Sequence, residues 1–167
     1  MSQEGAVRRY VETKLQTLSG NNTTVATPIF RVTGSVKINK IYGVVQTALG
    51  SNVTAAYLRT NDQTAQVAIS LATGVTLSSF AIGSLITRKS LVSVALSADN
   101  ASAAKVVDPV AATAPDVLMP FAVVQKTGGV QTDIEFVYTT TNTPTSGVIK
   151  WYCEFEPLTE DGDVRAV

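Results

Sequence analysis

The stretch 148–156 (VIKWYCEFE) constrains most strongly what this chain can fold into. One set of alternate positions is apolar and holds Ile149, Trp151, Cys153 and Phe155. The other set is mostly polar and holds Val148, Lys150, Tyr152, Glu154 and Glu156. Because successive side chains of a β-strand point to opposite faces, this pattern predicts a strand with one buried and one solvated face. A helix would scatter the same apolar residues around its axis.

Similar runs recur from residue 27 onward and are separated by turn residues such as those at 49–52, 60–63 and 127–129. Roughly eight to ten strands spaced about ten residues apart favour an all-β fold: an antiparallel sandwich, a jelly roll or a barrel, with a short N-terminal arm that is helical or extended. Asn39-Lys40 interrupts one apolar run and predicts a break between two strands. The last two long strands, around 134–138 and 148–156, predict an antiparallel hairpin.

Residues 3–18 are the one helical candidate. Val7, Val11, Leu15 and Leu18 are spaced by four, four and three positions, which aligns them on one side of a helix. Such a helix packs on its own domain, or it serves as an arm that reaches a neighbouring subunit, or the segment is disordered. In the arm interpretation these four residues are the candidate contacts with a subunit or a capsid. Residues 19–24 then form a flexible linker.

The chain accordingly divides into an N-terminal arm and linker (1–27), a β-domain (28–158) and an acidic tail (159–167), of which residues 159–163 are expected to form a solvated terminus. The N-terminus carries an early acid and no apolar core, so no secretory signal is expected. No apolar run approaches the length of a membrane span.

Composition argues against an enzyme. Histidine is absent, which removes the commonest general base and the usual metal ligand, and no catalytic, cofactor-binding or metal-binding residues are expected. Thirteen basic and thirteen acidic side chains cancel, so nucleic acid is not an expected partner. Cys153, on the apolar face of its strand, is expected to be a small buried hydrophobe.

Three carboxylates are candidates for acid–base chemistry. Glu135, Glu154 and Glu156 occupy positions that alternation predicts to be solvated, with Lys37, Lys150 or Arg31 available to balance them across strands. A charge-balanced, solvated face is the expected outcome. Among the aromatic residues, Trp151 and Phe155 are expected in the core, and Tyr152 is the exposed one.

Several segments carry a resemblance to a known class of proteins: 40–45 (KIYGVV), 58–64 (LRTNDQT), 107–116 (VDPVAATAPD) and the run 121–138. In these segments the chain resembles small virion structural proteins of tailed bacteriophages, of the capsid decoration or cement type. The resemblance implies a β-rich protein, often a homotrimer, that assembles in the host cytoplasm. It also implies a place on the outer surface of the virion, bound to the major capsid protein lattice. No functional residues follow from it.

Other functions compete with this one. A head-fibre, tail or receptor-binding module would bind cell-surface carbohydrate through an exposed aromatic such as Tyr152. A non-viral carbohydrate-binding or adhesion module is the third candidate, and an enzyme is the last.

Overall fold

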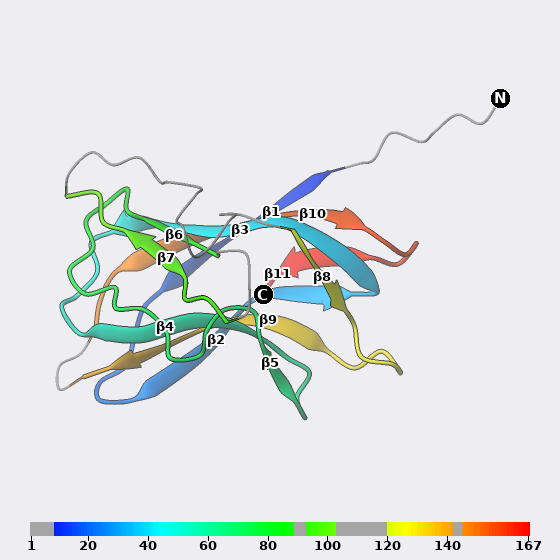
Figure 1. Cartoon of the computed structure of the whole chain (residues 1–167), viewed down its shortest axis with the longest axis horizontal. Coiled ribbons are helices and arrows are strands. Elements are labelled where there is room, and N and C mark those ends of the chain that lie inside the picture. Colours follow the sequence, from blue (N-terminus) through cyan, green and yellow to red (C-terminus); the bar gives the residue numbers. More distant parts are fainter. Residues whose placement is uncertain (1–8, 89–92, 103–119, 142–144) are drawn as a thin grey trace.

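The computed structural model describes residues 9–88, 93–102, 120–141 and 145–167, and it is a β-sandwich (Figure 1). Every regular element of these residues is a strand. The strands are β1 (Tyr10–Thr17), β2 (Thr24–Thr33), β3 (Ser35–Thr47), β4 (Val53–Asn61), β5 (Gln66–Ala68), β6 (Leu85–Thr87), β7 (Ser97–Asp99), β8 (Phe121–Val124), β9 (Thr132–Thr140), β10 (Val148–Pro157) and β11 (Asp163–Ala166). The expected all-β class is confirmed, and the architecture is the sandwich.

Two antiparallel sheets make the two layers. Sheet A has the order β1-β10-β3-β6-β7, with β8 paired to β3 beside β6. Sheet B has the order β11-β2-β9-β4-β5. In Figure 1, β1, β10 and β3 lie above β2, β9 and β4. The two longest strands of sheet A, β3 and β10, are neighbours within it.

The core lies between the sheets and follows the period-two pattern. Ile134, Phe136 and Tyr138 of β9 are fully buried, as are Ile149 and Trp151 of β10. Phe136 and Trp151 meet across the sandwich with ring centroids 4.8 Å apart. Because each large apolar side chain contributes roughly 1.5–3 kcal/mol when fully buried, these contacts supply much of the driving force for stacking the sheets.

The hairpin prediction for the last two long strands is wrong. β9 pairs with β2 and β4 in sheet B, whereas β10 pairs with β1 and β3 in sheet A. The chain thus crosses from one layer to the other between the two strands. This arrangement sets the apolar face of β9 against that of β10, whereas a hairpin would have left both faces on the same side.

The predicted break at Asn39-Lys40 is also wrong, because β3 runs through both residues. The irregularity there is a β-bulge: Ile38 lies opposite Phe155 and Lys40 opposite Glu154. The chain instead turns at Gly34, where it crosses from β2 in sheet B to β3 in sheet A, and Gly34 has φ +58°. This φ lies in the left-handed region that favours glycine, and a Cβ at Gly34 would also lie 2.5 Å from the Asp161 side chain, which would have to shift.

Both ends of the described chain belong to the sheets. Residues 10–17 form an edge strand of sheet A, so the helix prediction is wrong there, and residues 3–8 lie outside the described residues. Residues 163–166 pair with β2 as an edge strand of sheet B, so the tail ends in a strand, whereas residues 159–161 are exposed, as expected.

Candidate interaction surface

Strand β1 reverses the usual polarity of a surface strand. Val11 and Leu15 point away from the sandwich and are 62% and 61% exposed. The alternate positions turn toward the interior, and they carry Tyr10, Glu12, Lys14 and Gln16. Sheets that face water normally place polar residues outside and apolar residues inside. The inversion therefore marks the outer side of β1 as a candidate contact surface.

Three inward residues of β1 contact other parts of the chain. Gln16 is buried, and its Oε1 accepts a hydrogen bond from the indole Nε1 of Trp151 at 2.8 Å. A carboxylate oxygen of Glu12 accepts one from the backbone N–H of Ala166 in β11 at 3.1 Å. The Tyr10 ring stacks on Phe155 at 5.4 Å. These contacts fix which side of β1 faces out.

The outer face of sheet A continues from β1 across β10 and β3. In register, Thr13 lies opposite Tyr152, which lies opposite Tyr42. Leu15 lies opposite Lys150, which lies opposite Val44. The Tyr42 and Tyr152 rings stack at 4.9 Å with an interplanar angle of 9°. A tyrosine pair therefore stands in the middle of this face, with Thr13 beside Tyr152 and Val44 two residues from Tyr42 on β3.

Charged groups surround the tyrosine pair. Lys40 pairs with Glu154 at 3.7 Å, and Arg9 lies 3.6 Å from the same carboxylate. The Lys150 ammonium lies 5.2 Å from the centre of the Tyr152 ring. Burial, with smaller contributions from Tyr152 and Glu154, raises the pKa of the Tyr42 hydroxyl. The Tyr42 hydroxyl is thus neutral at neutral pH, and charged groups lie around the tyrosine pair.

We name this region, centred on Val11, Leu15, Tyr42, Val44 and Tyr152, the outer face of sheet A. Of the four residues expected to contact a subunit or capsid, Val11 and Leu15 lie on it. Leu18 is 3% exposed and belongs to the core, and Val7 lies outside the described residues. Sequence reasoning missed Tyr42. The sequence signal for Tyr42 was that it and Val44 occupy alternate positions of one strand and so share a face.

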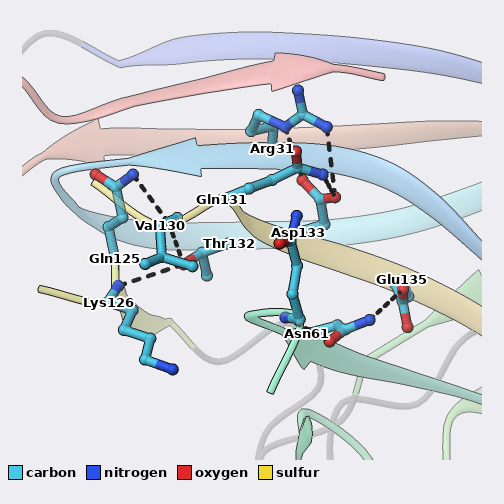
Figure 2. A network of polar contacts seen from close by, with 10 residues as sticks. Arg31, Asn61, Gln125, Lys126, Val130, Gln131, Thr132, Asp133 and Glu135 are labelled. Atoms are coloured by element: carbon cyan, nitrogen blue, oxygen red, sulfur yellow. Dashed lines mark hydrogen bonds and ion pairs between the residues drawn. The ribbon is translucent and has the colours of Figure 1, made fainter. Parts of the chain in front are cut away.

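The outer face of sheet B is different, because it is covered by a polar network (Figure 2). Arg31 donates to Asp133 at 2.9 Å, and Arg59 donates to Glu135 at 2.7 Å. Asn61 adds a second hydrogen bond to Glu135 at 2.8 Å. Each carboxylate on β9 is thereby satisfied by its neighbours in the sheet, which suits a structural role.

The three candidate carboxylates, Glu135, Glu154 and Glu156, do not form one site. Glu135 lies in sheet B, while Glu154 and Glu156 lie in sheet A. Glu156 accepts hydrogen bonds from Asn39 at 2.9 Å and from Lys37 at 3.3 Å. Basic residues balance all three carboxylates, but Lys37 is the one expected partner among them, since Glu135 pairs with Arg59 and Glu154 with Lys40. Glu135 and Glu156 are 5% and 8% exposed, so the prediction that they are solvated is wrong.

Cys153 is fully buried, as expected, and burial raises the pKa of its thiol. No group of three or more acidic or cysteine side chains that could hold a metal ion occurs in the described part of the chain. Within the same residues, no helix is long and apolar enough to cross a membrane.

A groove of about 300 Å³ opens between the sheets at the edge formed by β5 and β8. Its walls include Val67, Ile69, Phe121 and Val123. Arg88 lies in it, 5% exposed, with its guanidinium 4.2 Å from the centre of the Phe121 ring and its Nε donating to the carbonyl of Ile69. Sequence reasoning did not anticipate this groove, because it is formed by residues from separate segments.

Comparisons of the chain with protein-family models, with curated proteins and with solved structures give no match.

Proposed function

We propose that this chain is a structural virion protein that binds the outer surface of a phage capsid lattice and stabilises it, with the outer face of sheet A as its contact. The observation that carries the proposal is the outward placement of Val11 and Leu15, each more than 60% exposed, at the edge of a sheet whose inner side is polar at β1. The resemblance to phage decoration proteins supports the choice of partner, the major capsid protein.

The physical case rests on burial. Covering Val11 and Leu15 in an interface would contribute roughly 1–2 kcal/mol for each side chain, given their present exposure. The stacked Tyr42–Tyr152 pair is the kind of aromatic centre that dominates many protein interfaces. Contacts of this size are weak singly, but a homotrimer, the state implied by the resemblance, would bind a lattice multivalently.

The testing experiment is sedimentation of the purified chain with capsids of its own virus that lack it. The double variant Val11→Ser, Leu15→Ser should bind at least about tenfold more weakly, since roughly 1.4 kcal/mol corresponds to a factor of ten. Ile82→Ser is the matched control, because Ile82 is 65% exposed and lies outside this face. A wild-type chain that does not sediment with capsids contradicts the proposal.

The alternative function is a head-fibre, tail or receptor-binding module that binds cell-surface carbohydrate. The Tyr42–Tyr152 pair favours it, since sugars stack on aromatic rings. However, Tyr152 already stacks on Tyr42 and carries Lys150 over its ring, which limits the ring surface left for a sugar. Binding to a glycan array that is lost in Tyr152→Ala, together with no capsid binding, would favour this alternative.

A further inference from the structure

One edge of β1 is unpaired, and one hydrogen bond shows which residues direct their backbone N–H and C=O groups toward it. Leu18 N–H donates to the Gly147 carbonyl at 2.9 Å, and this pair continues the β1–β10 register in which Thr17 lies opposite Val148. Backbone groups of alternate residues in a strand point to opposite edges. Glu12, Lys14 and Gln16 therefore direct their N–H and C=O groups toward β10, as Leu18 does.

The backbone N–H and C=O groups of the odd-numbered residues point to the other edge of β1. These residues are Val11, Thr13, Leu15 and Thr17. β1 is the outermost strand of sheet A, and no strand in the described part of the chain pairs with it on that side. Edge strands of this length normally carry proline, inward charges or a bulge that hinder pairing with another chain. β1 contains no proline, and its register with β10 shows no bulge. Its charges, Glu12 and Lys14, are therefore the feature that decides what can pair with it.

The sequence of β1 is self-complementary about Thr13. Residues 11–15 read Val-Glu-Thr-Lys-Leu. If two copies pair antiparallel with Thr13 opposite Thr13, Val11 of one copy meets Leu15 of the other. Glu12 then meets Lys14 in the same way. Opposite charges and apolar pairs in directly facing positions stabilise antiparallel strands.

Backbone geometry agrees with this register. The facing pairs Thr13–Thr13 and Val11–Leu15 all consist of residues whose N–H and C=O groups point to the free edge, so each pair can exchange both backbone hydrogen bonds. Glu12 and Lys14 then face each other in the closer, non-hydrogen-bonded positions, with Cα atoms about 4.5 Å apart.

Neighbouring registers are disfavoured by charge. Shifting the two-fold centre to residue 12 would place Glu12 opposite Glu12, and shifting it to residue 14 would place Lys14 opposite Lys14. Like charges in facing positions destabilise a strand pair. A shift that faces residues 12 and 13 would set inward side chains opposite outward ones. The register centred on Thr13 is the one that charge, polarity and hydrogen bonding all favour.

We propose that β1 pairs with β1 of a second copy of this chain, antiparallel and centred on Thr13, so that sheet A continues across a two-fold axis. An isologous interface of this kind uses the same patch on both copies. The pairing brings Val11 of each copy beside Leu15 of the other, and so joins two outer faces into one apolar strip. It goes beyond the proposed attachment to a capsid and does not depend on it.

The first test is Thr13→Pro, with particle mass measured by light scattering on a sizing column. The Thr13 N–H faces the free edge, so proline removes an intermolecular donor and leaves the hydrogen bonds to β10 intact. The wild-type particle should have twice the mass of the variant, whether the pairing joins two monomers or two trimers. Equal masses at the highest attainable concentration would overturn the proposal.

A second test remains informative even if proline at residue 13 prevents folding. Glu12→Lys places lysines opposite lysines, and Lys14→Glu places acids opposite acids, so each variant alone should self-associate roughly tenfold more weakly. An equimolar mixture restores both opposite-charge pairs and should associate like the wild type. Single variants that associate normally, or a mixture that does not recover, would overturn the proposed register.

The two proposals fail separately. Thr13→Pro retains Val11 and Leu15, so it keeps the single-copy capsid contact while losing the pairing. If the chain binds capsids but its particle mass never doubles, the pairing proposal alone is refuted. If the chain pairs in solution but does not bind capsids, the capsid-binding proposal alone is refuted.

Discussion

The indole nitrogen of Trp151 donates a hydrogen bond to the side-chain oxygen of Gln16 at 2.8 Å, and both side chains are buried. This contact joins the edge strand β1 to the centre of the core. It explains why a polar residue of β1 faces inward while Leu15, its neighbour, faces out. This buried hydrogen bond is thus one of the contacts that orient the proposed interaction surface.

We therefore expect Gln16→Leu to lower the free energy of unfolding by about 1–2 kcal/mol, because it leaves the buried indole N–H without an acceptor. The loss is moderated because the Gln16 Nε2 has no hydrogen-bond partner in the described structure. Urea unfolding measures the change, and Thr17→Val at an exposed position should alter stability by less than about 0.5 kcal/mol. A Gln16→Leu protein as stable as the wild type would argue against this role.

Gly74→Ala should be among the most damaging single changes. Gly74 has φ +69°, and a Cβ there would lie 2.2 Å from the backbone carbonyl carbon of Ala55. Since neither backbone can yield, we expect a loss of more than about 3 kcal/mol or failure to fold. Thermal unfolding compares it with Gly128→Ala, where φ is +91° and the space is open. That control should lose only about 1–2 kcal/mol, and equal losses would contradict the steric argument.

Arg59→Met should destabilise the fold by about 2–4 kcal/mol. The Arg59 and Glu135 side chains are only 16% and 7% exposed, so removing the guanidinium leaves a buried carboxylate with Asn61 as its remaining side-chain donor. Arg165→Met breaks a pair that is 83% and 37% exposed and should change stability by less than about 0.5 kcal/mol. Denaturant unfolding of both variants tests the contrast, which disappears if burial is not the cause.

The loop after β4 should make stability sensitive to acid. Backbone N–H groups of Ala65 and Thr64, in that order, hold the pKa of Asp62 well below its usual range. A carboxyl group with a lowered pKa stabilises the fold above its unfolded pKa, near 4, and loses this contribution as the pH falls further. The melting temperature of Asp62→Asn should therefore lie below that of wild type at pH 7, with a gap that narrows below about pH 4. A gap that widens on acidification would contradict this assignment.

Local pattern anticipated the environment of many residues. Alternation assigned Trp151, Phe155 and Cys153 to the core, and all three are buried. It also left Tyr152 on the outer side, where it is partly exposed. These predictions succeed because the direction of a side chain in a strand depends only on the pleat of its own backbone.

The helix prediction for the N-terminal segment failed for an identifiable reason. Val11 and Leu15 are four residues apart, and this spacing places them on one side of a helix and equally on one face of a strand. The choice was made by contacts that are distant in sequence: the pairing of β1 with β10 and the hydrogen bond from Trp151 to Gln16.

The sequence by itself determined the all-β class and which apolar side chains of β9 and β10 turn inward, because both follow from period-two alternation along a single strand. The tertiary structure alone decided which strands are neighbours. It separated β9 and β10 into opposite sheets, it made edge strands of β1 and β11, and it brought Tyr42 beside Tyr152. Strand pairing is chosen by how completely the apolar faces of the whole chain can be buried together. That depends on every strand at once, and no single segment encodes it.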